Sequence, residues 1–145
     1  MYQFKLQALL NHRRHQEEVC QKELAEAQRD LSDAQKKLRS LKKNKRESIQ
    51  TLQARQNQPH KASSILIFIN YIDKLTIDIG AQTQQVHRAS KQVTQKRDSL
   101  IAIMKKRKTL EKLKEKEWLD YQQKMMQAER KFNDEIAATR HIRKM

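Results

Sequence analysis

Few residues of this chain could do chemistry, and His12 and His15 are the first pair to consider. Their spacing of three residues would place both imidazole rings on one helix face, where they could reach one metal ion. Arg13 and Arg14 lie between them, and their positive charges repel a cation. The sequence therefore predicts a solvated histidine pair and no metal site.

Cys20 is the single cysteine, which excludes an internal disulfide and fits a reducing compartment. It falls on an apolar helical seam, where a cysteine behaves as a small buried side chain. The sequence contains no glycine-rich phosphate loop, no zinc-type Cys/His spacing and no His-Glu-x-x-His motif. We therefore expect neither an enzyme nor a bound cofactor.

Composition argues against a globular core, because 145 residues include one Gly, one Pro, 34% charged residues and 5% aromatic residues. No apolar run reaches the roughly 18 residues that cross a bilayer, and the first residues lack a secretory signal. These features predict a soluble cytoplasmic protein. Its net charge of +15 would attract nucleic acid, an acidic lipid surface or an acidic protein groove.

The elements that position these residues are long helices with heptad seams. Leucines at 10, 24, 31, 38 and 52 keep a seven-residue grid, and Ala27, Ala34 and Leu41 fall between them. This alternation predicts a coiled-coil helix over residues 4–56. Arg13 and Glu17, four residues apart, are expected to form a local ion pair. The polar residues on this seam are Arg13, Glu17, Lys45, Ser48 and Arg55.

A second seam follows the only proline, Pro59, and predicts a turn over 57–63 and a helix over 64–141. Two apolar stripes separated by a short break can cover each other by folding back. The predicted fold is all-α: one coiled-coil domain, 1–145, in which two long helices form a monomeric antiparallel hairpin, with position i facing ~121 minus i. The second seam comprises Ile65, Ile69, Ile72, Ile79, Val86, Val93, Leu100 and Met104.

The second helix is longer than the first, so residues 119–145 should overhang. Their apolar stripe contains Tyr121, Met125, Ala128, Phe132 and Ile136. An unpaired apolar stripe indicates a surface that a partner protein covers. The alternatives are that the first helix extends less regularly and covers part of this stripe, or that the end frays.

Two irregularities interrupt the second helix. Gly80 predicts a bend or a close approach to the first helix, because glycine disfavours a helix interior. Leu110 and Leu113 fall off the grid of the preceding residues, which predicts a stutter between residues 103 and 118.

The run from Ile65 to Ile72 is apolar nearly all round, although a hairpin buries only one side of a helix. With Ile65 and Ile69 on the seam, Phe68 and Leu75 would form an outward stripe, with Ile72 and Ile79 at its margin. This stripe predicts a docking site. Packing against the turn and self-association remain as alternatives.

Two basic runs, Lys36–Arg46 and Lys105–Lys116, raise the question of nucleic-acid binding. The first contains no acid, and neither contains an aromatic residue for base stacking. A solvated helix face or an acidic protein partner therefore explains the runs better than specific nucleic-acid recognition.

In the order of its motifs and its length, the chain resembles the flagellar export protein FliJ family. The resemblance covers nearly the whole chain, and its motifs are Phe4-x-Leu6-x-x-Leu9-Leu10-x-x-Arg13 with Glu17, then Asn70-Tyr71-Ile72, then Glu129-Arg130-Lys131-Phe132-Asn133-Asp134-Glu135 with Ala137.

The resemblance implies a stalk-like coiled coil at the cytoplasmic face of the inner membrane. Its joined termini would enter the centre of the hexameric export ATPase, and it would also contact the membrane export gate and export chaperones. The ATPase-binding residues would be Leu6, Arg13, Tyr121, Met125, Ala128, Phe132 and Ile136. The gate-binding residues would be Phe68, Ile72, Leu75 and Ile79. The equivalent stalk of a virulence-type injectisome and a basic nucleic-acid-associated coiled coil are the alternatives.

Overall fold

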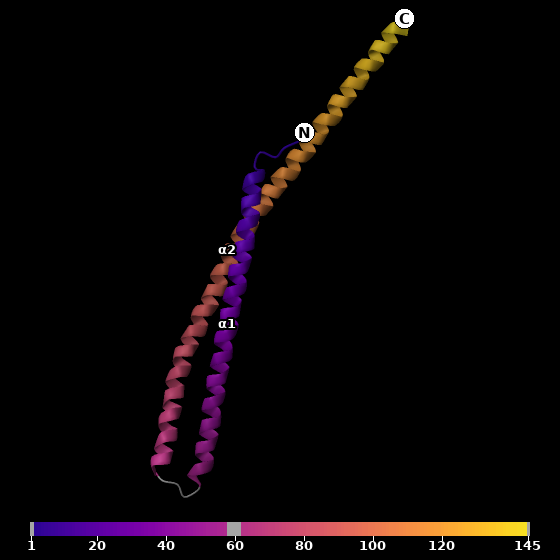
Figure 1. Ribbon diagram of the computed structural model, residues 1–145. Coiled ribbons are helices and arrows are strands. Elements are labelled where there is room, and N and C mark those ends of the chain that lie inside the picture. The colour runs from indigo at the N-terminus through magenta and orange to yellow at the C-terminus, as the bar shows by residue number, and fades with distance from the viewer. Residues whose placement is uncertain (1, 58–61, 145) are drawn as a thin grey trace. The chain divides into compact units, whose positions relative to one another are not determined.

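The chain consists of two long α-helices in a computed structural model that describes residues 2–57 and 62–144 (Figure 1). Helix α1 is Gln7–Gln56 and helix α2 is Ala62–Lys144. The sequence predicted helices over 4–56 and 64–141, so α1 begins three residues later and α2 two residues earlier than expected. Most of the predicted turn, residues 58–61, lies outside the described residues. The described residues of the chain contain no β-strand.

The chain divides into two compact units. Unit 1 comprises Met1–Glu18 and Ile101–Met145, and unit 2 comprises Val19–Leu100. In unit 2, α1 and α2 run side by side and antiparallel (Figure 1). In unit 1, the first turns of α1 pack in the same sense against α2. The predicted all-α antiparallel coiled coil with a longer second helix is therefore confirmed.

The seam of α1 follows the predicted heptad. Leu10 is fully buried, and Ala27 and Ala34 are 8% and 9% exposed. The leucines at 24, 31, 38 and 52 are half-buried, as expected for a two-stranded coiled coil with one covered face. Fully burying a leucine side chain stabilises a fold by about 1.5–3 kcal/mol, so Leu10 contributes about this much and each half-buried leucine contributes less.

The seam of α2 differs in phase from the prediction at two places. Leu75, expected to point outward, is 4% exposed, whereas Ile69, expected on the seam, is 40% exposed. The run from Ile65 to Ile72 is apolar on all sides, so it fits two phases equally well. The observed seam keeps an alternating spacing of three and four through residues 65, 68, 72, 75, 79, 82, 86, 89, 93, 96 and 100.

Contacts between the helices follow the predicted register. In unit 1, Lys114 Nζ donates a hydrogen bond to Gln7 Oε1 at 2.6 Å. In unit 2, Lys96 Nζ lies 3.2 Å from Glu23 Oε2, and Gln82 Nε2 donates to the backbone carbonyl of Ala34 at 3.0 Å. The residue numbers of these pairs add to between 116 and 121, close to the value that a fold-back near residue 60 requires.

Gly80 makes no close approach to α1, because a Cβ atom built at this residue would have nothing within 4 Å. Its backbone has no positive φ. The predicted close approach is therefore wrong, and the alternative of a bend at Gly80 stays a prediction.

The stutter predicted between residues 103 and 118 stays a prediction. Half-buried residues occur there in two heptad phases, one through Ile103 and Leu110 and one through Met104 and Glu111, with Arg107 and Lys114 common to both.

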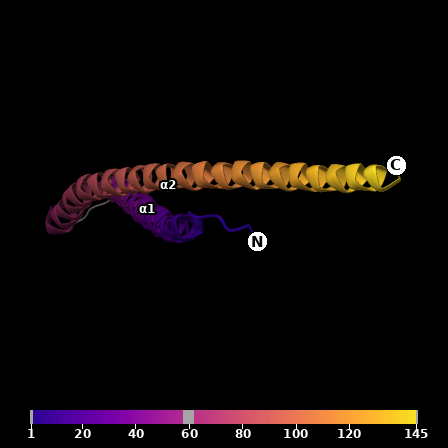
Figure 2. The same cartoon turned by 90° about the horizontal axis from the view of Figure 1, so that it is seen from above.

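The last part of α2 has no covering helix within unit 1 (Figure 2). Every described residue from 122 to 144 is exposed. Of the helices in the described part of the chain, neither has a stretch long and apolar enough to cross a membrane.

Candidate functional site

The exposed end of α2, residues 122–144, carries the predicted apolar stripe on unit 1. Met125 is 49% exposed, Phe132 is 63% exposed and Ile136 is 36% exposed. Ala128 is also exposed. These four residues recur at helical spacing, so they share one face of the helix. A shallow groove of about 360 Å³ runs beside Phe132 and Ile136, and an apolar side chain of a partner could enter it.

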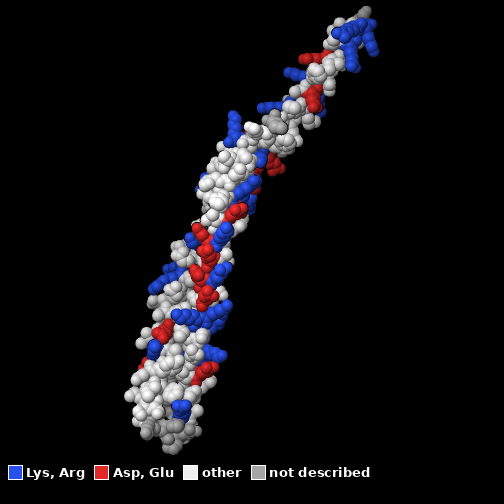
Figure 3. All heavy atoms as spheres, in the orientation of Figure 1, with Lys and Arg blue, Asp and Glu red and all other residues white. Residues whose placement is uncertain are grey.

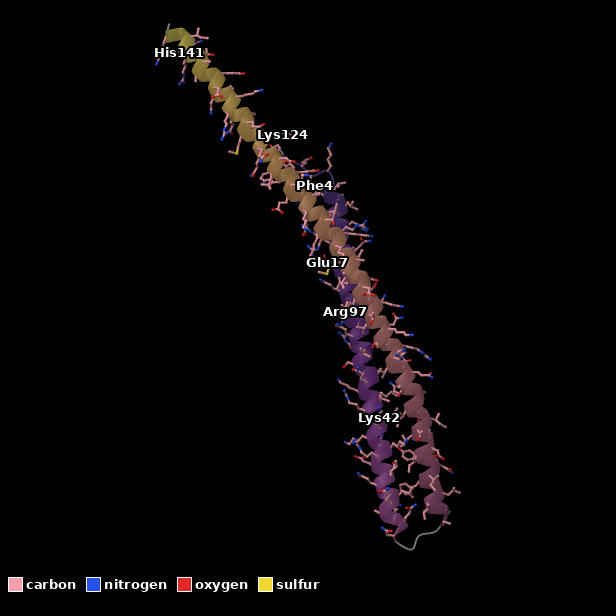
Figure 4. The ribbon with its side chains drawn as sticks, turned by 180° about the vertical axis from the view of Figure 1, so that it is seen from behind. Phe4, Glu17, Lys42, Arg97, Lys124 and His141 are labelled. Carbon is pink, nitrogen blue, oxygen red and sulfur yellow. The ribbon has the colours of Figure 1, made fainter. Side chains whose placement is uncertain are left out.

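Charged side chains accompany this stripe (Figure 3). The last turn of α2 contains His141, Arg143 and Lys144, and Lys124 and His141 lie on the uncovered part of the helix (Figure 4). A positive helix end complements the partial negative charge of a helix C-terminus. It also favours encounter with an acidic partner.

An aromatic cluster closes the base of the uncovered segment within unit 1. The ring of Tyr2 lies 5.2 Å from the ring of Trp118 in an edge-on arrangement and 5.4 Å from the ring of Tyr121. The rings of Trp118 and Tyr121 stack at 5.9 Å. Aromatic pairs in such geometries add about 0.5–1.5 kcal/mol beyond their burial. The non-helical N-terminal residues therefore hold α2 at the point where the cover of α1 ends.

Tyr2 also contacts the backbone, since its hydroxyl donates to the carbonyl of Lys114 at 3.4 Å. Burial raises the pKa of the Tyr2 hydroxyl, and the negative charge of Glu117 raises it further. Tyr121 belongs to this cluster and is half-buried, so only the other four residues of the predicted overhanging stripe are fully uncovered. Part of the overhang is thus covered by an irregular N-terminal segment, one of the two alternatives considered from the sequence.

The remaining predicted ATPase-binding residues lie on the first turns of the chain. Leu6 is 38% exposed. Arg13 Nη1 donates to Gln16 Oε1 at 2.8 Å, so Arg13 does not form the expected ion pair with Glu17. Both residues belong to unit 1, as do the cluster and the uncovered part of α2.

Glu17 instead forms an ion pair with Arg107 of α2. Arg107 also binds Glu111 at 2.8 Å, and Arg14 lies 3.5 Å from the other oxygen of Glu111. The hydrogen bond from Arg107 lowers the pKa of Glu111, and the nearby charges of Arg107 and Arg14 lower it further. A hydrogen bond to Glu111 likewise raises the pKa of Arg107. A charged layer therefore replaces an apolar one in the seam of unit 1.

The predicted gate-binding residues lie on unit 2 and do not form an outward stripe. Leu75 is buried, and Ile72 and Ile79 are half-buried on the seam. Phe68 is covered by Arg55, whose guanidinium carbon lies 4.8 Å from the ring centroid. This cation–π contact places the aromatic ring against α1. The expectation that Phe68 and Leu75 point outward is therefore wrong.

Other apolar residues of this segment are exposed, and the sequence interpretation missed them. Leu66 is 58% exposed, Ile67 is 68% exposed and Ile77 is 72% exposed. The missed residues of unit 1 are Tyr2 and Trp118. A seam drawn through Phe68 and Leu75 predicts that Leu66, Ile67 and Ile77 are exposed. No periodic signal marks Tyr2, because it precedes the helix.

The two basic runs lie on exposed helix surface, apart from the seam residues Lys45, Arg107 and Lys114. His12 and His15 are exposed, and Cys20 is half-buried and free. In the part of the chain that the structure describes, no group of three or more His, Cys, Asp or Glu residues could hold a metal ion. The arrangement offers binding surfaces formed by apolar and basic side chains.

Comparisons with known proteins agree with this architecture. A family model described as flagellar FliJ protein matches residues 2–145. A solved structure described as a YscO homolog, CT670, from Chlamydia trachomatis has a TM-score of 0.58 and 21% sequence identity, covering 97% of this chain and 96% of that one. The likeness to that structure extends to the fold alone. A comparison with curated proteins gives no match.

Proposed function

Because the chain belongs to the flagellar FliJ protein family, we propose that it is the stalk-like coupling component of a flagellar type III protein export apparatus. It works at the cytoplasmic face of the inner membrane by binding other proteins. Its partners are the hexameric export ATPase, the membrane export gate and export chaperones.

The observation that carries this proposal is the uncovered end of α2 in unit 1. Met125, Phe132 and Ile136 are exposed on a helix that has no neighbour in this part of the described chain. Burying such side chains in a partner is favourable by about 1.5–3 kcal/mol each. The centre of a hexameric ring offers the surrounding cover that a single helix lacks. Leu6 and Arg13 of the same unit join this contact.

Basic side chains near the stripe, such as Arg143 and Lys144, suit acidic loops of the ATPase. Charge complementarity at a rim raises the association rate more than it raises affinity. Contacts of this kind exchange readily, which a coupling component needs when its partner changes conformation during each ATP hydrolysis cycle. Tyr2, Trp118 and Tyr121 hold the base of the binding segment.

The proposed gate contact lies on residues 65–79 of α2 in unit 2. Phe68, Ile72 and Ile79 are half-buried on the seam and offer a partner only their accessible edges, whereas the buried Leu75 supports them by packing. Since the two proposed contacts lie on different units, a single chain would join the ATPase to the gate.

Binding of the purified chain to the export ATPase tests the proposal. Phe132→Asp should weaken binding by about tenfold, because a charge cannot enter an apolar contact without a partner. Gln127→Asp is the matched control, since it adds the same charge to an exposed residue of the same segment on the opposite helix face. Equal affinities for the two variants would refute the ATPase contact. Recovery of an injectisome ATPase from the native cell would identify the alternative secretion system.

A further inference from the structure

A groove with an apolar floor and a cationic rim lies on unit 2. It has a volume of about 340 Å³ and is lined by Lys42, Lys45, Arg46, Ile49, Gln50 and Ile79. All but Ile79 belong to α1, and Lys42 can be located on this helix in Figure 4. The groove is separate from the uncovered end of α2, which belongs to unit 1.

The cations of this rim form no ion pair with any residue that the structure describes. In the described residues, no carboxylate lies within ion-pair distance of Lys42, Lys45 or Arg46, although their neighbour Lys43 lies 4.0 Å from Glu47. The groove lining itself contains no acidic residue. Three positive charges therefore surround an apolar floor, and their field favours an anionic group at the rim.

Lys45 is the most informative of these residues, because it occupies a seam position of α1 and is half-buried. An apolar residue there would pair the helices better, since a polar residue on a coiled-coil seam lowers stability. The side chain of Lys45 lines the groove instead. The position of Lys45 therefore suits ligand binding better than it suits pairing of the two helices.

We propose that this groove binds an acidic segment of a partner protein that inserts an apolar side chain between Ile49 and Ile79 and sets carboxylates against Lys42, Lys45 and Arg46. The recessed floor favours a peptide over a bilayer. Ile49 and Ile79 are half-buried, so they cannot protrude into lipid, whereas a leucine of a peptide can descend to them. The cationic rim of α1 goes beyond the gate contact proposed above, with which the groove shares only Ile79.

Titration with a synthetic amphipathic helix, carrying a leucine stripe flanked by glutamates, tests the proposal on the full chain. The peptide should bind saturably, and chemical-shift changes should centre on the amides of Ile49 and Ile79. The double variant Lys42→Glu with Arg46→Glu should raise Kd by about tenfold. Absence of saturable binding would overturn the proposal.

The matched control is Lys36→Glu with Arg39→Glu. These two residues belong to the same basic run, are exposed and do not line the groove. Both double variants lower the net charge equally. If general electrostatic attraction holds the peptide, both should weaken peptide binding equally. If the groove holds it, the control should bind the peptide as the native chain does. Equal weakening would therefore contradict the proposal.

Lys45→Leu separates a binding role from a structural one. It should raise the melting temperature, because it restores an apolar seam, and at the same time weaken peptide binding. A lower melting temperature would show that Lys45 stabilises the hairpin and would contradict its assignment to the ligand.

A competition experiment with vesicles of phosphatidylglycerol and phosphatidylcholine tests whether a lipid surface occupies the groove. The groove should still bind the acidic peptide when such vesicles are present, and vesicles should not displace it. Displacement by anionic vesicles, with no effect of vesicles of phosphatidylcholine alone, would overturn the peptide assignment in favour of a lipid surface. None of these experiments contains the ATPase or the gate protein, so their failure would leave the proposed function unaffected.

Discussion

Glu17 of α1 and Arg107 of α2 form an ion pair within the seam of unit 1, with side chains only 13% and 19% exposed. Glu111 is the second carboxylate at Arg107, at 2.8 Å. A charged layer between apolar layers fixes register, because a slip would leave each charge without its partner. Arg107 precedes Trp118 by about three turns of α2, so the layer lies close to the point where the cover of α1 ends.

Breaking this pair should cost more than replacing it. Glu17→Ala should lower the melting temperature measured by circular dichroism, because it leaves Arg107 with one carboxylate fewer in a partly buried site. Glu17→Leu combined with Arg107→Leu should restore or exceed the original value, since apolar residues pair well on a seam. Additive losses in the double variant would contradict this account of the layer.

Acid should weaken the same layer through Glu111. Its pKa is lowered in the folded chain, mainly by the hydrogen bond from Arg107, relative to an ordinary value of 4.5. A lowered folded pKa means that the contribution to stability is fully present above about pH 4.5 and is lost as the pH falls through the folded pKa. Melting curves should show this loss in the native chain and a smaller one in Glu111→Gln. Parallel pH profiles would argue against the role of Glu111.

Trp118 provides an optical probe of the aromatic cluster, because it is the single tryptophan. Tyr2→Ala should shift its emission to longer wavelength and increase its quenching by acrylamide, since the ring of Tyr2 shields it at 5.2 Å. Tyr71→Ala is the control, because Tyr71 is 46% exposed and belongs to unit 2. If Tyr2→Ala leaves the emission unchanged, the N-terminal segment does not cover Trp118.

Leu75 should behave as a core residue. Leu75→Ala should reduce the free energy of unfolding by about 2–5 kcal/mol, because it deletes a buried side chain. Ile77→Ala should change it by about 0.5 kcal/mol or less, since Ile77 is 72% exposed. Urea unfolding of both variants gives the comparison. Similar values for the two would mean that Leu75 is not on the seam.

Gly80→Ala should stabilise the chain by about 1 kcal/mol, the difference in helix propensity between the two residues. The new methyl group would meet nothing within 4 Å, and the backbone at Gly80 needs no positive φ. Thermal melting measures this gain. A loss of stability would indicate that Gly80 has a conformational role in the helix interior.

The sequence predicts the fold well where apolar residues alone define the seam. The leucines and alanines of α1 set its phase, and the register between the helices follows from the fold-back. The prediction fails where polar residues occupy seam positions. Gln82 is buried and bonded to the backbone of Ala34, and Arg107 is ion-paired, but neither adds to a hydrophobic period. Their partners on α1 become known only when the helices are placed together.

Apolar periodicity also predicts part of the candidate site. Met125, Phe132 and Ile136 repeat at helical spacing beyond the reach of α1, so exposure follows from the unequal lengths of the helices. Phe68 and Leu75 were misassigned because their neighbours are also apolar, which leaves the phase open. Tyr2 packs on Trp118 through a non-helical segment, and no periodicity predicts such a contact.

Removing residues 122–145 tests the central claim most directly. A chain ending at Tyr121 keeps the aromatic cluster and the charged layer, so its helical melting transition should persist. Its affinity for the purified export ATPase, measured by calorimetry, should fall below detection, because the apolar stripe that we propose enters the ring has been deleted. Unchanged affinity of the truncated chain would contradict the account.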